Sequence, residues 1–155
     1  MRRAALLLGL LAVAAPAAAG EIGSWRNDWT GNGLIVDAIP DPKVEGVTCH
    51  IVRFSRSLID RVSKGNWFED PSNAGIACSQ TGPIVIGAIE KGAAGEDVFS
   101  ERLSLVFKSL RVRRLWDEAN QALVYVTYSR QVTDASAKVD ISSIALRGQE
   151  VTWRP

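Results

Sequence analysis

The sequence predicts a mainly β protein, either an antiparallel sandwich or a partly closed barrel, with one short helix in the loop between its two cysteines. Three observations predict this class. Apolar and polar residues alternate with a period of two over several segments, extended helical periodicity is missing, and glycine and proline turn signals separate the segments. No internal repeat or low-complexity linker divides the chain, so we expect residues 20–155 to form one domain.

Residues 1–19 have the three parts of a cleavable export signal. Two arginines provide a positive start, residues 4–15 are apolar and uncharged, and residues 17–19 are the small residues of a cleavage site. A retained membrane anchor is disfavoured, because a spanning helix needs roughly 20 consecutive apolar residues and Pro16 interrupts this run. We expect cleavage after Ala19, export, and no transmembrane segment in the mature protein.

The charge balance argues against nucleic acid as a partner. The chain has 18 basic and 17 acidic residues, and losing Arg2 and Arg3 with the leader would leave 16 basic residues against 17 acidic ones. A nucleic-acid-binding domain normally carries a clear basic excess on one face. We therefore expect no nucleic-acid partner.

Cys49 and Cys78 are the only cysteines, and an even count in an exported chain predicts a disulfide bond between them. Their spacing does not fit a CxxC redox pair, and His50 alone does not supply the further ligands of a zinc site. We expect neither a metal nor a cofactor. A loop of this length should stabilise the fold by about 3 kcal/mol in the chain-entropy model.

The first half of the domain predicts short strands over residues 34–39, 47–54, 75–80 and 84–86. In the second of these, Cys49 and Ile51 point to one side and His50 to the other. We expect Gly82-Pro83 to form a turn between the last two strands.

Two other segments of the first half are not predicted to be strands. Residues 21–33 should form an irregular N-terminal segment that Trp25 and Trp29 anchor on the domain. Between the cysteines, Ser57 is placed to cap a short helix over residues 58–64.

The second half predicts a hairpin. Apolar residues of two successive stretches lie at opposite parity: Leu103, Leu105 and Phe107, then Leu110, Val112 and Trp116. This change of parity predicts a bulge or bend near residues 108–109. The β-branched and aromatic residues 123–128 predict the partner strand, and residues 134–155 should add one more.

Four runs of the sequence resemble the CreA family, in order along the predicted domain: residues 41–49 (DPKVEGVTC), 76–84 (IACSQTGPI), 101–110 (ERLSLVFKSL) and 123–129 (LVYVTYS). The resemblance implies a small periplasmic protein of Gram-negative bacteria, with no established activity and no catalytic residues to carry over. Residues 55–68 are richer in charge and bulk than the glycine-rich segment of family members, so no role of that loop is carried over.

Most chemistry-bearing residues have a simpler structural interpretation. His50 is the only histidine and the only ready general base, but no Gly-x-Ser-x-Gly sequence accompanies it. Residues 31–33 (GNG) precede a strand and predict a turn rather than a phosphate loop. The acidic pairs at 69–70, 96–97 and 117–118 are expected to be solvated turn residues, because their spacing is not that of a calcium loop.

Arg111 and Arg113 are the sharper candidates, because alternate residues of a strand place two guanidinium groups about 7 Å apart on one side. Such a pair suits a carboxylate or phosphate. Pairing with an acid such as Glu101, or solvation, is the competing interpretation. Trp116, with Trp67, could line a groove for a ligand.

Two hypotheses follow. The first is a non-catalytic binding or envelope-associated module that takes an envelope protein or a small anionic ligand through Arg111, Arg113 and Trp116. The second is a hydrolase or isomerase of unrecognised type that uses His50 and a nearby acid. We favour the first.

Overall fold

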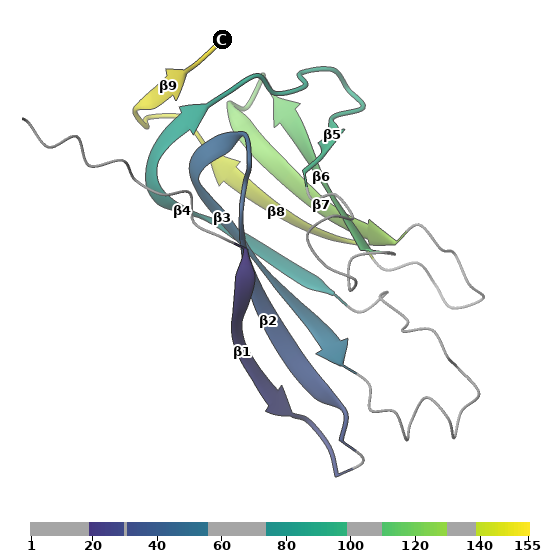
Figure 1. Cartoon of the computed structure of the whole chain (residues 1–155). Coiled ribbons are helices and arrows are strands. Elements are labelled where there is room, and N and C mark those ends of the chain that lie inside the picture. The colour runs from purple at the N-terminus through teal and green to yellow at the C-terminus, as the bar shows by residue number, and fades with distance from the viewer. Residues whose placement is uncertain (1–18, 30, 56–73, 99–109, 130–138) are drawn as a thin grey trace, which may run out of the picture.

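The computed structural model describes residues 19–29, 31–55, 74–98, 110–129 and 139–155, and every regular element among them is a β-strand (Figure 1). The predicted leader, the helix over residues 58–64 and the bend near residues 108–109 lie outside these residues. In the described part, no helix has the length and apolar character to cross a membrane.

The described strands form two sheets. The five-stranded sheet has the order β1-β2-β3-β4-β9 and consists of Gly20–Arg26, Gly33–Pro40, Val44–Ser55, Gly75–Ile86 and Val151–Trp153. The four-stranded sheet has the order β5-β6-β7-β8 and consists of Glu96–Asp97, Leu110–Asp117, Ala122–Ser129 and Asp140–Ala145. All neighbours are antiparallel except β4 and β9. The mainly β, antiparallel prediction is therefore confirmed, as two open sheets rather than a closed barrel.

One apolar core lies between the sheets and follows the predicted alternation. Cys49 and Ile51 of β3 are fully buried, and so are Val112 of β6 and Leu123 of β7. Burying such side chains removes apolar area from water at about 25 cal/mol per Å², which is the main stabilising contribution to a fold of this kind. The parity of each strand thus decides which side chains enter the core.

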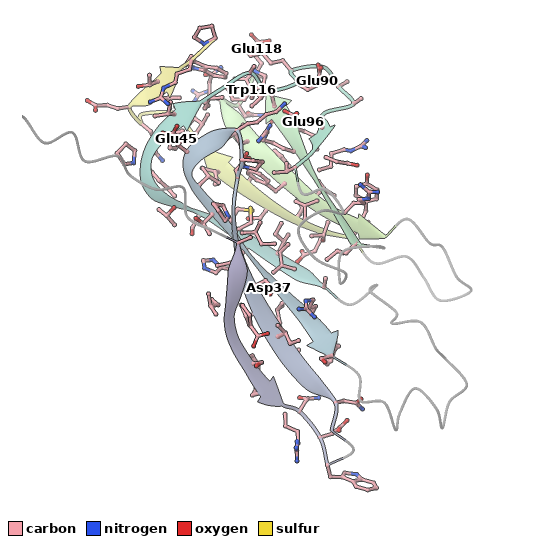
Figure 2. All side chains as sticks on the ribbon, viewed as in Figure 1. Asp37, Glu45, Glu90, Glu96, Trp116 and Glu118 are labelled. Atoms are coloured by element: carbon pink, nitrogen blue, oxygen red, sulfur yellow. A yellow bond between two sulfur atoms is a disulfide. The ribbon has the colours of Figure 1, made fainter. Side chains whose placement is uncertain are left out.

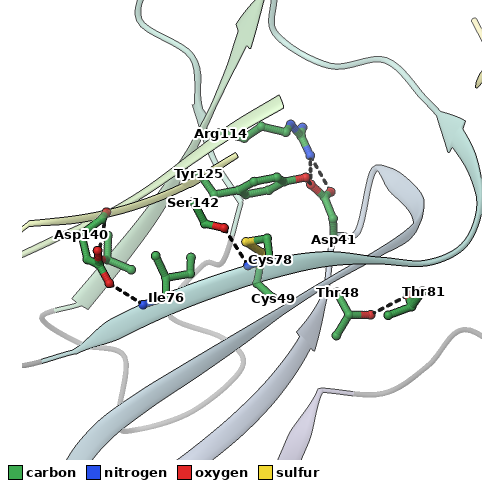
Figure 3. Close-up of a disulfide and its surroundings, with 11 residues drawn as sticks. Asp41, Thr48, Cys49, Ile76, Cys78, Thr81, Arg114, Tyr125, Asp140 and Ser142 are labelled. Atoms are coloured by element: carbon green, nitrogen blue, oxygen red, sulfur yellow. Dashed lines mark hydrogen bonds and ion pairs between the residues drawn. A yellow bond between two sulfur atoms is a disulfide. The ribbon is translucent and has the colours of Figure 1, made fainter. Parts of the chain in front are cut away.

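The predicted disulfide bond is present and joins β3 to β4. Cys49 and Cys78 are directly opposite each other in the antiparallel register, with their Cα atoms 3.9 Å apart. Figure 3 shows the bond between the two strands, beside side chains of the second sheet. The bond therefore fixes the register of β3 against β4 as well as closing the loop between them.

The turn predicted at Gly82-Pro83 is wrong, because β4 runs without a break from Gly75 to Ile86. The glycine and proline lie instead in an irregularity of the ladder: Glu45 pairs with Val85, but Val47 pairs with Gln80. Extra residues of β4 thus lie opposite Gly46, and such a bulge bends the strand without ending it. Proline is tolerated there because a bulge leaves ladder donors unpaired.

The N-terminal segment also differs from its prediction. It forms strand β1, paired with β2, instead of an irregular segment. Trp25 is 52% exposed and Trp29 is 92% exposed, so neither anchors the segment in the core. Strand formation here was hidden from sequence patterns because β1 lies at a sheet edge and has almost no buried face to impose alternation.

The hairpin of β6 and β7 is confirmed, with Asp117 opposite Ala122 at its tight end. The strand predicted in residues 134–155 is β8, and β9 follows as a short additional strand on β4. Ile144 of β8 and Leu146 just after it are buried, whereas Ile141 is on the exposed face of β8.

Side chains of β8 cover part of the edge of β4. Asp140 accepts a hydrogen bond from the backbone N–H of Ile76 at 2.8 Å, and the Ser142 hydroxyl accepts one from that of Cys78 at 2.8 Å (Figure 3). Alternate residues of β8 thus satisfy alternate donors of β4, in the way that a neighbouring strand would. Further along, β9 pairs with residues Ile84 to Ile86.

The bulge generates the first testable prediction, because it needs a glycine at position 46. Gly46 has a φ of +79°, and a Cβ there would lie 2.3 Å from the Pro83 carbonyl oxygen. Gly148 has the same φ with open space around it. We expect Gly148→Ala to cost about 1 kcal/mol of unfolding free energy and Gly46→Ala about 3 kcal/mol, since only the second must also displace backbone. Urea denaturation measures both, and equal losses would contradict the tight packing at the bulge.

Candidate functional site

The predicted arginine pair lies on the outer face of the four-stranded sheet. In β6, Leu110, Val112 and Arg114 are buried, so the alternate residues Arg111 and Arg113 face away from the core. The structure therefore brings together the two guanidinium groups that the sequence predicted.

Asp97 of β5 joins this pair, and Tyr128 of β7 completes it. Asp97 accepts hydrogen bonds from Arg113 Nε at 2.9 Å and from the Tyr128 hydroxyl at 2.9 Å, and its other oxygen is 3.7 Å from Arg111 Nη1. The Arg113 guanidinium lies 5.4 Å from the centroid of the Tyr128 ring. We call these four residues the arginine face.

The charges of the arginine face support one another. Partial burial alone would raise the pKa of the Asp97 carboxyl, but the hydrogen bonds from Arg113 and Tyr128 and the charges of both arginines lower it below its usual value. The hydrogen bond and charge of Asp97 raise the pKa of Arg113 in turn. Asp97 therefore stays ionised at neutral pH and holds Arg113 in a fixed orientation.

Arg113 keeps donors available after these contacts. Its Nε binds Asp97 and its Nη1 reaches the Ala94 carbonyl at 3.3 Å, whereas its Nη2 has no hydrogen bond to any described residue. Its side chain is 39% exposed. A guanidinium fixed in this way can donate to a carboxylate or phosphate oxygen that approaches from solvent.

Trp116 is not part of the arginine face. It lies at the other parity of β6, where its ring meets that of Trp153 edge to face with centroids 5.5 Å apart. Lys91 Nζ is 4.2 Å from the centroid of the Trp153 ring. Figure 2 labels Trp116 of this small cluster, close to Glu118 at one end of the molecule. The structure thus separates Trp116 from Arg111 and Arg113, and Trp67 lies outside the described residues.

His50 has no acidic residue directly opposite it on either neighbouring strand. It lies on the outer face of β3, where its direct cross-strand neighbours are Ala38 of β2 and Ala77 of β4. Gly31 and Asn32 lie in the connection between β1 and β2, near the predicted turn, and Gly33 is the first residue of β2. Gly31 has a φ of +90°. Among the described residues, no three His, Cys, Asp or Glu side chains gather as a metal site requires.

Residues 96 and 97 are not turn residues as expected, because both form strand β5 and both are ion-paired. Asp97 is exposed, as expected, whereas Glu96 is half-buried. Partial burial alone would raise the pKa of Glu96, but hydrogen bonds from Lys43, the Glu90 N–H and Arg114 together lower it. Asp117 is the last residue of β6, and Glu118 lies in the turn that follows, as expected. The Asp117 carboxylate accepts hydrogen bonds from the backbone and side chain of Asn120. The pair at 69–70 lies outside the described residues.

A buried ionic cluster escaped sequence reasoning. Arg114 of β6 pairs with Asp41, which follows β2, and with Glu96 of β5. The side chains of Arg114 and Asp41 are 2% and 0% exposed (Figure 3). Asp41 also accepts hydrogen bonds from the Tyr125 hydroxyl at 2.7 Å and from the backbone N–H groups of Lys43 and Val44.

The surroundings fix the protonation states of this cluster. Desolvation alone would lower the pKa of Arg114, but the hydrogen bond and charge of Asp41 raise it. Burial, together with the charge of Asp41, raises the pKa of Tyr125 far above its usual value, so its hydroxyl remains a donor. The cluster connects both sheets and is enclosed, which makes it a structural element. One feature of the sequence pointed to it: Arg114 follows Leu110 and Val112 at every second position, so its side chain is on the face of β6 that enters the core.

The contrast between neighbouring arginines is testable. We expect Arg114→Met to lower the unfolding free energy by about 3 to 5 kcal/mol, because it leaves Asp41 buried without its cation. Arg113→Met, one position away on the exposed face, should cost less than about 1 kcal/mol. Chemical denaturation of both variants provides the measurement. Similar losses for the two would contradict a structural role specific to Arg114.

Comparison with known proteins agrees with the sequence resemblance. The family model described as CreA protein matches residues 22–149. Protein CreA of Escherichia coli strain K12 is 38% identical, in an alignment that covers 96% of this chain and 95% of that protein, and the same figures hold for Protein CreA of E. coli O6:H1 and O157:H7. No solved structure matches the chain. On the family match and on this identity, the chain belongs to the CreA family.

Proposed function

We propose that this protein is exported to the periplasm and acts by binding rather than by catalysis, with the arginine face as its site for an anionic group. The group is a carboxylate or phosphate, carried by an envelope protein or by a small ligand. The predicted contact of Trp116 with the ligand stays a separate prediction, because Trp116 and the arginine pair occupy opposite faces of β6.

The observation that carries the binding proposal is the fixed orientation of the Arg113 side chain. Asp97 and the Tyr128 ring hold the guanidinium, while its Nη2 and 39% of its side chain remain open. An immobilised guanidinium loses little conformational freedom when it binds an anion, and this lowers the cost of association. Arg111 adds a second positive charge on the same face.

The enzyme alternative has less support. A general base such as His50 needs an acid or a nucleophile within hydrogen-bond reach. The residues directly across the sheet from His50 are alanines on both sides. Binding at the arginine face needs no residue beyond those already in place.

Two sequence features support export. The first is the signal-type pattern of residues 1–19, and the second is the cysteine pair, whose disulfide bond would persist in an oxidising compartment such as the periplasm. A disulfide bond between directly opposite residues of two neighbouring strands suits a protein that folds after leaving the reducing cytoplasm.

The binding site is tested by two substitutions that should change the affinity for anions in opposite directions. Arg113→Ala should weaken the binding of inorganic phosphate and of a short Glu-rich peptide about tenfold, because it removes the exposed donors. Asp97→Asn should strengthen it severalfold, because it removes the negative charge that repels an anion, while the amide oxygen of asparagine can still accept the hydrogen bond that orients Arg113. Titrations followed by ¹H–¹⁵N spectra give both affinities.

His50→Ala is the matched control and should bind both probes like the parent protein. Unchanged affinity in Arg113→Ala, or weaker binding in Asp97→Asn, would rule out the arginine face as the anion site. Loss of the protein's cellular role in His50→Ala, with anion binding intact, would favour the enzyme alternative.

Export is tested at the cleavage site. In a Gram-negative host, Ala19→Leu should accumulate the uncleaved protein, because signal peptidase requires a small residue there, whereas Ala18→Leu should be processed normally. Mass spectrometry of periplasmic and cytoplasmic fractions identifies the N-terminus. Recovery of the parent protein in the cytoplasm, with its leader and with both thiols free to react, would overturn the proposal.

A further inference from the structure

Strand β1 is an edge strand of the five-stranded sheet. It ends the order β1-β2-β3-β4-β9, and no described strand lies on its outer side (Figure 1). Its sequence, GEIGSWR, contains neither the lysine nor the proline that commonly discourages edge pairing. The edge of β4, in contrast, is covered by Asp140, Ser142 and β9. Within the described part of the chain, no strand pairs with the backbone N–H and C=O groups along the outer side of β1, and an unpaired edge of this kind can take another strand.

A bulge in β1 places two opposite charges on one face. Glu21 pairs with Asp37 and Arg26 with Gly33, which lie four residues apart on β2 and so share a face. Glu21 and Arg26 are five positions apart in the sequence, so a regular strand would place them on opposite faces. The register shift between Glu21 and Gly23 reverses this parity.

The opposite face of β1 carries apolar surface beside an open position. Trp25 on this face is 52% exposed, and Ile22, which lies at the bulge, is 62% exposed. Gly23 shares the face of Trp25, since their partners Val36 and Leu34 lie two residues apart on β2. A Cβ at Gly23 would meet no atom within 4 Å, so the space above this glycine is open. An aromatic ring from a neighbouring strand can cover such a glycine.

We propose that β1 pairs antiparallel with β1 of a second copy of this chain, about a two-fold axis at Ser24. Counted along the β2 ladder, Ser24 faces Ile35, and the positions at equal distances on either side are those of Trp25 with Gly23 and of Arg26 with Glu21. The axis therefore places Arg26 of each chain opposite Glu21 of the other. It also places each Trp25 ring over the Ile22–Gly23 bulge of the other chain.

One register satisfies both faces at once, and this identifies a second copy as the occupant. Two Glu21–Arg26 pairs form on one face and two Trp25 contacts on the other, because a two-fold axis repeats every contact. A slip of one position would bring side chains of opposite faces together and lose all four contacts. The charges of Glu21 and Arg26 on one β1 strand are thus complementary to those on an antiparallel β1 strand of the second copy.

Sedimentation velocity on the purified exported protein, from about 5 to about 500 µM, tests this pairing. We expect a dimer whose fraction rises with concentration and falls with added salt. Glu21→Lys and Arg26→Glu should each weaken association about tenfold, because each creates two like-charge pairs. Combining the two substitutions should restore association, since the charges are only exchanged.

Glu118→Lys is the matched control, because it makes the same charge change at an exposed turn remote from β1 and should leave association unchanged. Circular dichroism checks that every variant is folded. A parent protein that stays monomeric throughout the concentration range overturns the proposal. So does a double variant that associates no better than the single ones, or a Glu118→Lys variant that associates as weakly as Glu21→Lys.

Discussion

The buried ion pair between Arg114 and Asp41 is the interaction on which the arrangement of the two sheets depends. Arg114 comes from the four-stranded sheet, and Asp41 comes from the connection that follows β2 in the other sheet. Two charges removed from water are costly unless each finds hydrogen-bond partners. Tyr125, Glu96 and the backbone beside Asp41 supply these partners. The pair therefore admits one relative position of the sheets, in which all these groups meet.

The same constraint explains the irregular backbone around the cluster. Gly95, at a φ of +58°, brings the chain so close to β6 that a Cβ would lie 2.3 Å from the Arg114 carbonyl oxygen, and Glu96 follows directly. Asp41 holds the Lys43 and Val44 N–H groups in the turn that starts β3. Glycine is required at such close approaches because any side chain would separate the two backbones. Backbone shape and buried charge thus depend on each other at this end of the molecule.

Strand parity divides three neighbouring arginines between structure and surface. The charge of Arg114 is paired with carboxylates in the protein interior. Arg113 is paired with one carboxylate, and part of its side chain is exposed to solvent. A guanidinium serves both purposes because it stays protonated in either environment. β1 and β4 differ in a comparable way: Asp140, Ser142 and β9 bind along the edge of β4, while no strand among the described residues pairs with the outer edge of β1. The proposed binding face and the proposed pairing edge lie on different sheets, so neither obstructs the other.

The mainly β class, the disulfide bond, the β6–β7 hairpin and the shared face of Arg111 and Arg113 were predictable from the sequence, because period-two alternation and cysteine count are local properties. Strand β1 was not, since an edge strand buries too little to impose alternation. Neither was the bulge at Gly82-Pro83, because the same two residues serve a turn or a bent strand. Nor was the ion pair of Asp41 with Arg114, because the two residues are 73 positions apart in the chain. Sequence alone determined which face each strand buries; only the tertiary structure decided which buried and exposed charges meet, because such pairing depends on how separate strands are brought together.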